Sequence, residues 1–302
     1  MHRILLAISI TFFFNFTFSQ SHHDIKIDAG NIHFETFGAG QPMLIINGGP
    51  GMNSEGFRGL ASILGKNNQA IIYDQRGTGK STLSNVNAQT ITMDNMVKDI
   101  ETIRAHLKIK EWVVLGHSFG GMLASYYATK HPENIKGLIL SSSGGINLDL
   151  FSGLDIQSRL SQNEKDSLDY WNAKVNSGDT SYHARYHRGK YLAPAYLYDK
   201  SNVEVVAHRL TQGNRRINEL VFQNMFSMEF DCEPSLKDFT SPVLIVQGAD
   251  DIIPVKISEY AHNIFPNSIL EVLEKCGHYG WLDRSTAYFS AIADFLDTQV
   301  YN

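Results

Sequence analysis

The chain has few cysteines, with two among its 302 residues, Cys232 and Cys276. Small disulfide-stapled domains carry more cysteines in a shorter chain, so two distant ones exclude a disulfide framework. They could pair in an oxidising compartment, but two buried or idle thiols are the favoured state. We therefore expect the fold to rest on a hydrophobic core, which a chain of this length can bury.

Excess charge of either sign is also missing. Lys and Arg number 26 and Asp and Glu number 31, which gives a formal net charge of −5 with no basic stripe or acidic tail. Proteins that bind nucleic acid concentrate positive charge on one face, so we expect no nucleic-acid partner. The composition is that of a globular rather than a disordered chain.

Long hydrophobic runs are absent except at the N-terminus. Residues 4–18 are rich in Ile, Leu and Phe after a short basic start, and small residues precede a plausible cleavage before Gln20. This pattern is typical of a secretory signal peptide over residues 1–19, because the run is shorter than a membrane span. We expect an exported protein, periplasmic or secreted, without a stable membrane span after cleavage. An uncleaved anchor is the alternative.

The most informative stretch follows a short apolar run at residues 112–115, which predicts a buried strand. Residues 116–120 are Gly-His-Ser-Phe-Gly, and small and apolar residues then continue as a helix. This is the G-x-S-x-G nucleophile elbow in its strand–turn–helix context, which predicts Ser118 as the catalytic nucleophile. Side chains at Gly116 and Gly120 would collide with neighbouring backbone. The alternative is a glycine-softened turn with an idle serine.

Backbone N–H groups complete the predicted site. The helix after the elbow directs its free N–H groups and positive dipole end toward the serine. A second buried strand, at 43–46, ends in Asn-Gly-Gly-Pro-Gly at 47–51, where backbone rather than side chains is presented. We expect the N–H groups of Gly49 and Phe119 to form an oxyanion hole, against the alternative of a tight turn without a ligand.

An acid and a histidine follow later core strands. A strand at 243–246 leads into Asp250 and Asp251, and the last strand, at 269–273, is followed by His278. The chain order Ser, Asp, His is that of hydrolase folds with a nucleophile elbow. We predict Asp251 as the triad acid, with Asp250 in reserve, and His278 as the base.

Strands and helices alternate through the first half of the chain, as in the amphipathic helix at 93–107. This alternation predicts an α/β fold with a mostly parallel sheet flanked by helices. From 146 to 238 helical stretches and aromatics replace the strands, which predicts an inserted helical cap over the ligand-binding edge. The core is then 20–145 and 239–302.

No cofactor or metal is expected. Residues 74–81 end in Gly-Lys-Ser, but a phosphate-binding loop needs glycine where Asp74 stands, so no nucleotide is implied. Asp74 and Arg76 should instead fix this loop with ion pairs and hydrogen bonds. His183 and His187 stand four apart without a third ligand, and a solvated cap face is favoured.

On these residues the chain resembles the α/β-hydrolase superfamily and, within it, the proline iminopeptidase group. The resemblance is carried by Gly-Gly-Pro-Gly at 48–51, by residues 74–81 and by the elbow at 116–121. Residues 218–220, Asn-Glu-Leu, are similar to the group's Asn-Glu-Phe segment, whose glutamate holds the substrate's free α-amino group. The resemblance thus implies Glu219 as an amine ligand. A solvated cap-helix glutamate is the alternative.

Two positions depart from the group's pattern. Asn47 stands where the loop usually begins with His, and Ile252 stands where some members carry a second acid. Loss of one amine-binding carboxylate would weaken recognition of a cationic N-terminus. The resemblance implies a serine aminopeptidase releasing N-terminal residues, proline especially, from short peptides. A hydrolase of small esters, lactones or amides and a non-catalytic binding protein are the other hypotheses.

Overall fold

The computed structural model describes residues 20–28 and 30–301. The predicted signal peptide, residues 1–19, lies outside the described residues. Within the described ranges, no helix combines the length and the apolar character that crossing a membrane requires.

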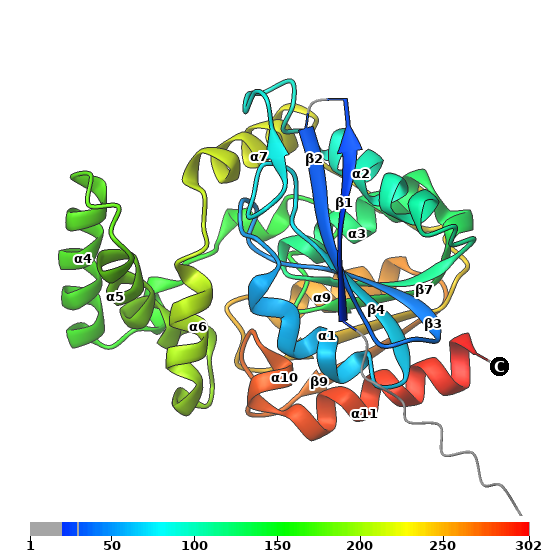
Figure 1. Cartoon of the computed structure of the whole chain (residues 1–302). Coiled ribbons are helices and arrows are strands. Elements are labelled where there is room, and N and C mark those ends of the chain that lie inside the picture. The colour runs from blue at the N-terminus through cyan, green and yellow to red at the C-terminus, as the bar shows by residue number, and fades with distance from the viewer. Residues whose placement is uncertain (1–19, 29, 302) are drawn as a thin grey trace, which may run out of the picture.

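A mixed, mostly parallel sheet forms the centre of the molecule (Figure 1). Its strands run in the order β1-β2-β4-β3-β6-β7-β8-β9, with β5 paired to β2. The pairs β3–β4, β3–β6, β6–β7, β7–β8 and β8–β9 are parallel, and β2 pairs antiparallel with its neighbours. The strands are β1 (Gln20–Ile27), β2 (Gly30–Phe37), β3 (Gln41–Ile46), β4 (Asn68–Tyr73), β5 (Thr82–Leu83), β6 (Trp112–His117), β7 (Ile135–Ser141), β8 (Val243–Gly248) and β9 (Ser268–Leu273).

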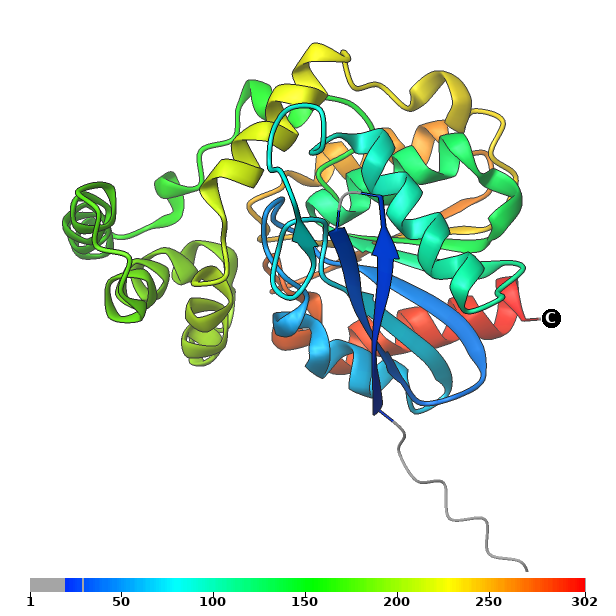
Figure 2. The same cartoon turned by 45° about the horizontal axis from the view of Figure 1, so that its top comes forward.

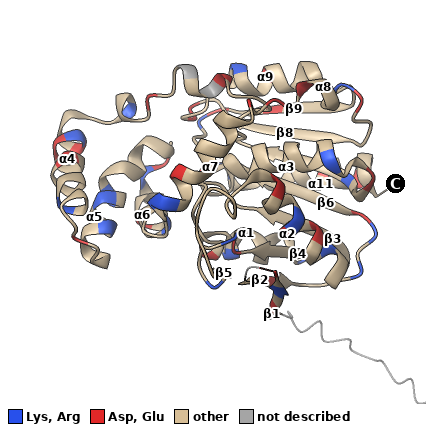
Figure 3. Cartoon of the chain, turned by 90° about the horizontal axis from the view of Figure 1, so that it is seen from above, with Lys and Arg blue, Asp and Glu red and all other residues tan. Residues whose placement is uncertain are grey.

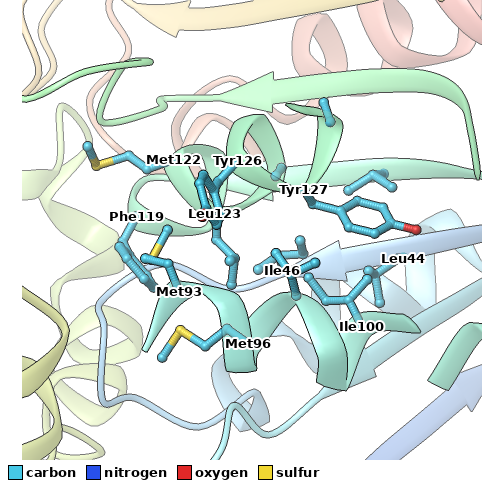
Figure 4. Close-up of a cluster of buried hydrophobic side chains, with 14 of the residues drawn as sticks. Leu44, Ile46, Met93, Met96, Ile100, Phe119, Met122, Leu123, Tyr126 and Tyr127 are labelled. Carbon is cyan, nitrogen blue, oxygen red and sulfur yellow. The ribbon is translucent and has the colours of Figure 1, made fainter. Parts of the chain in front are cut away.

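Helices cover both faces of the sheet, as the alternation of strands and helices predicts. The buried side chains of β3 divide between the two faces, with Leu44 and Ile46 on one and Met43 and Ile45 on the other. On the first face α2 and α3 pack over the strands (Figure 4). The flanking helices are α1 (Arg58–Leu64), α2 (Met93–His106), α3 (Phe119–Lys130), α9 (Val255–Ile264), α10 (Gly280–Asp283) and α11 (Ser285–Phe295).

The described residues between β7 and β8 contain helices and no strand. Of these helices, α4, α5 and α6 stand off one side of the sheet, whereas α7 lies over its edge (Figures 1 and 2). A capping box of Ser161 and Glu164 begins α4, and α7 buries Ile217 and Val221 in the core. The helices are α4 (Gln162–Asn176), α5 (Tyr182–Leu192), α6 (Val203–Leu210), α7 (Arg215–Ser227) and α8 (Glu233–Leu236).

The two cysteines are free and buried on opposite faces of the sheet. Cys232 packs with the cluster that contains α2 and α3, and Cys276 packs with the cluster that contains α11. Burial raises the pKa of the Cys276 thiol to about 12 and raises the pKa of the Cys232 thiol still further. Both side chains therefore serve as small apolar packing groups.

Candidate active site

Ser118 occupies a strained turn between β6 and α3. Its backbone has φ 56° and ψ −122°, a conformation that residues with a side chain rarely adopt. Neighbouring backbone holds this geometry: the Ser118 N–H donates to Ser141 O at 3.1 Å, and Ser118 O accepts from the Gly144 N–H at 3.1 Å. The loop after β7 thus locks the turn that presents the hydroxyl.

The two elbow glycines are required by close contacts of the backbone. A Cβ atom at Gly116 would lie 2.3 Å from the carbonyl oxygen of Gly120. A Cβ atom at Gly120 would lie 2.1 Å from the carbonyl oxygen of Ile46, at the end of β3. The predicted collisions are therefore confirmed, and they explain how closely α3 approaches the sheet beneath the serine.

Asp251 and His278 meet through a hydrogen bond. His278 Nδ1 lies 2.8 Å from Asp251 Oδ1, and both residues are buried. The carboxylate also accepts from the Ile253 N–H at 3.1 Å and from Gln247 Nε2 at 3.0 Å. Its negative charge is thus held by three donors, one of them the imidazole. Asp250, the reserve candidate, makes no such contact with the ring, and its N–H donates to Cys276 O.

Ser118 and His278 line the same cavity, which has a volume of about 300 Å³. Within the described part of the chain no hydrogen bond joins the two side chains, a common state of catalytic pairs without substrate. The cavity has no Asp, Glu or Lys in its lining, and Arg209 is the one arginine there. Its apolar wall consists largely of Met52, Met122, Phe151, Leu154, Ile156, Phe222, Ile252 and Ile253.

The two backbone N–H groups predicted for the oxyanion hole belong to residues of this cavity lining. Gly49 has φ 69°, and neither its N–H nor that of Phe119 donates to an acceptor in the described ranges. The glycine loop lies directly against Ser118, because a Cβ atom at Gly48 would approach Ser118 Cβ to 2.7 Å. Two unused donors beside a serine suit a developing negative charge on oxygen.

His117 was not among the predicted site residues, yet it contacts the backbone of His278. Its Nε2 lies 2.8 Å from the carbonyl oxygen of His278, which can only accept, so Nε2 carries the proton. Its Nδ1 is buried without a partner. Burial lowers the pKa of His117 well below its usual range, so the ring is neutral near pH 7. The signal in the sequence was the His inside the elbow motif.

The loop after β4 is fixed by the charged groups predicted to hold it. Asp74 Oδ1 accepts from the N–H and the hydroxyl of Ser54, both at 2.8 Å, and Asp74 Oδ2 accepts from the Lys80 N–H at 2.8 Å. Arg76 forms a buried ion pair with Asp99 on α2 at 2.7 Å. Both contacts are structural, and neither residue lines the cavity.

Glu219, the predicted amine ligand, lies outside the cavity lining. Its carboxylate pairs with Arg215 one turn earlier on α7, Oε1 to Nε at 2.8 Å, and its side chain is 51% exposed. Its neighbour Asn218 lines the cavity instead and donates to Pro50 O at 3.0 Å. The structure therefore brings Ser118 and His278 to one cavity but leaves Glu219 on the surface of the helix.

Two histidine groups bear on the question of metal binding. His183 and His187 on α5 pack against Trp171, with ring centroids 5.3 and 4.7 Å away. A separate group on the β1–β2 hairpin brings ligand atoms of His22, His33 and Glu35 within 4.8 Å of one another. Arg58 already binds Glu35 through two nitrogens. None of these residues lines the cavity.

Comparisons with known proteins agree with this architecture. The family model described as alpha/beta hydrolase fold matches residues 41–285. A proline iminopeptidase of Heyndrickxia coagulans is 27% identical over 294 residues, covering 91% of this chain and 98% of that protein. An alpha/beta fold family hydrolase of Bacillus anthracis is 22% identical with a TM-score of 0.76, and the match covers 91% of this chain and 99% of that one. The proline iminopeptidase of Mycobacterium smegmatis is 21% identical with a TM-score of 0.66, and the match covers 93% of this chain and 99% of that one.

Proposed function

The chain belongs to the alpha/beta hydrolase fold family, and we propose that it is a serine hydrolase acting through an acyl-enzyme on Ser118. One observation carries this proposal. Ser118, on a strained elbow, shares a cavity with His278, whose Nδ1 is hydrogen-bonded to the buried Asp251. That constellation is recognised by its geometry and roles.

The residues of the site account for each step of the reaction. His278 Nε2 takes the proton of the Ser118 hydroxyl as its oxygen attacks an ester or amide carbonyl. Asp251 holds the imidazole in the required tautomer through Nδ1 and stabilises the imidazolium. The N–H groups of Gly49 and Phe119 stabilise the oxyanion, each by about 3 kcal/mol in comparable sites. His278 then protonates the leaving group, and water, activated by His278, releases the acyl group.

Two substrate classes have separate support. The relatives named proline iminopeptidases support an aminopeptidase that releases N-terminal residues from short peptides. The lining of the cavity supports a small ester, lactone or amide, because it offers no carboxylate to a substrate ammonium group. We propose the second class as the one that the geometry supports best, and we keep residues 146–238 as a cap that limits substrate size.

Ser118→Ala tests the proposal. We expect turnover of a neutral aryl ester to fall by about 10³-fold or more, because only binding and the oxyanion donors remain. Labelling by a fluorophosphonate, monitored by intact mass, should disappear at the same time. Ser125→Ala is the matched control, since Ser125 lies buried on α3 and outside the cavity lining. A Ser118→Ala protein that kept full turnover would refute the mechanism.

Export is a separate proposal that rests on the sequence of residues 1–19. Expression of the full chain in a bacterial host with N-terminal sequencing of the mature protein tests it. We expect the mature protein to begin near Gln20. An intact Met1 on the exported fraction would show an uncleaved anchor instead.

A further inference from the structure

A second cavity adjoins the one that contains Ser118. Residues of α4, α5, α6 and α7, of the segments that follow α5 and α6, and of the loop after β3 form its lining. It shares six residues with the first cavity: Gly49, Pro50, Met52, Tyr196, Leu210 and Asn218. The ring of Tyr196 lies 5.5 Å from that of His278. A substrate bound at Ser118 that extends past Tyr196 therefore enters the second cavity.

The charged side chains in the lining of the second cavity are all arginines. Arg185, Arg188 and Arg215 belong to it, and no Asp or Glu does. Arg215 is neutralised by Glu219, but Arg185 and Arg188 have no carboxylate within ion-pair distance in the described part of the chain. Figure 3 marks the basic positions of α5 and α6 in blue.

The hydrogen bonds of these two arginines leave most of their donors unused. Arg188 is half-buried and donates from Nε to Asn172 Oδ1 at 2.8 Å. Arg185 is exposed and donates from Nη1 to Thr211 O at 3.3 Å. A guanidinium has five N–H donors in a fork that matches a carboxylate, so each arginine retains donors for a bidentate anion.

The first cavity adds positive charge of its own. Arg209 on α6 is buried, has no carboxylate partner in the described ranges, and donates to Gly48 O, Asn53 O and Gln212 Oε1 at 2.8 to 2.9 Å. Its hydrogen bonds tie the helix to the oxyanion loop, so its role is structural. Its charge is nevertheless not paired with a carboxylate in the described ranges and lies in the lining of the cavity that contains Ser118, so a substrate ammonium group would meet like charge there.

We propose that the enzyme prefers substrates that carry a carboxylate, bound by Arg185 and Arg188, together with an apolar part held around Ser118. The proposal rests on the proposed serine-hydrolase function and names its substrate class. The apolar part of such a molecule packs against the wall of the first cavity, and its carboxylate lies in the basic lining of the second. A free N-terminal amine is the substrate that this arrangement disfavours.

Matched aryl esters test the preference. Phenyl hydrogen glutarate against phenyl glutaramate places the acid on the acyl side, and 4-carboxyphenyl butyrate against 4-carbamoylphenyl butyrate places it on the leaving group. We expect kcat/KM to favour the acid in at least one pair by about tenfold, the scale of one charge-assisted hydrogen bond. The ratio should fall as NaCl screens the arginines.

Variants assign the preference to the arginines. Arg185→Gln and Arg188→Gln should lower kcat/KM for the acid ester more than for the neutral ester, so that the ratio of the two falls toward one. Lys190→Gln is the matched control on α5, because Lys190 pairs with Glu204 and lines neither cavity. Equal kcat/KM within both pairs, or faster cleavage of proline 4-nitroanilide than of every acid ester, would overturn the proposal.

Binding separates this inference from the proposed function. If Ser118 neither cleaves the neutral esters nor takes the fluorophosphonate label, the hydrolase proposal has failed. Calorimetric titration of Ser118→Ala with 5-phenylvalerate and 5-phenylvaleramide then still decides the anion preference. Tighter binding of the acid that is lost in Arg188→Gln supports the arginine site, and equal binding of acid and amide refutes it.

Discussion

The two halves of the site are built in different ways. The sheet supplies Ser118, Asp251 and His278, which lie in the segments that follow the carboxyl ends of β6, β8 and β9 and are fixed by hydrogen bonds or backbone strain. The insertion between β7 and β8 supplies α4 to α7. In the second cavity its Arg185 is exposed and its Arg188 is half-buried, and neither has a carboxylate partner in the described part of the chain, whereas Arg215 pairs with Glu219. The contrast shows that the sheet fixes the positions of Ser118, Asp251 and His278, whereas the insertion adds side chains that differ in exposure and in partners. Under the proposed function, the first set carries the reaction and the second selects the substrate.

Asp251→Asn should have the largest effect among the changes that probe this contrast. The amide would favour the wrong tautomer of His278 and would not stabilise the imidazolium, so we expect kcat to fall by about 10⁴-fold on acid and neutral esters alike. Steady-state kinetics on both esters measures this loss. Asp250→Asn is expected to stay within about twofold. A larger loss for Asp250 than for Asp251 would reverse the assignment of the acid.

His117→Gln should change how stability depends on pH. The buried ring stays neutral in the folded protein, whereas in the unfolded chain it binds a proton below its ordinary pKa of about 6.5. The unfolded state then holds more protons, so the free energy of unfolding falls as pH decreases below about 6.5, by up to about 1.4 kcal/mol per pH unit. Gln keeps an Nε2 donor for His278 O but does not titrate, so this contribution to the pH dependence of stability is lost.

Urea unfolding of each protein at pH 5 and at pH 7 measures the change. Because each protein is compared with itself, loss of packing by the smaller side chain cancels. We expect the difference between the two pH values to be smaller in His117→Gln than in the wild type. The same difference in both proteins would mean that His117 takes up its proton in the folded state.

Glu219→Gln should have the smallest effect. The carboxylate lies on the insertion, outside both cavity linings, and its exposed partner Arg215 contributes less than about 1 kcal/mol through this pair. We expect kcat/KM for a proline arylamide and for a neutral ester to stay within about twofold. Glu204→Gln, an equally exposed acid paired with Lys190, is the control. Selective loss of arylamide cleavage in Glu219→Gln would restore its predicted role as an amine ligand.

The sheet half was predictable because its signals are local. A short apolar run followed by glycines or by an acid predicts a buried strand and the residue at which it ends. The carboxyl ends of parallel strands then meet at one edge of the sheet. The hydrogen bond between Asp251 and His278 follows from that logic, although only coordinates separate Asp251 from Asp250. The sequence also contains the signal for which face of α7 is buried. Ile217, Leu220 and Val221 lie on that face, and Glu219 does not.

The insertion half was not predictable in the same way. An arginine in a sequence does not reveal whether a carboxylate lies beside it, because the partners come from other helices. Arg188 and Arg209 are distinguished only by tertiary neighbours, an asparagine for one and backbone carbonyls for the other. His117 was not predicted as a site residue for a related reason. Its role depends on a hydrogen bond to the carbonyl oxygen of His278, 161 positions later in the chain.

The positions of the two thiols have a practical consequence. With the whole sheet between Cys232 and Cys276, oxidation cannot join them inside one folded molecule, and reducing agents have no bond to break. The fold of the described residues therefore does not depend on a disulfide bond. Both sulfur atoms react with an alkylating reagent only when the core opens, so the rate of alkylation reports how often each face of the sheet comes apart.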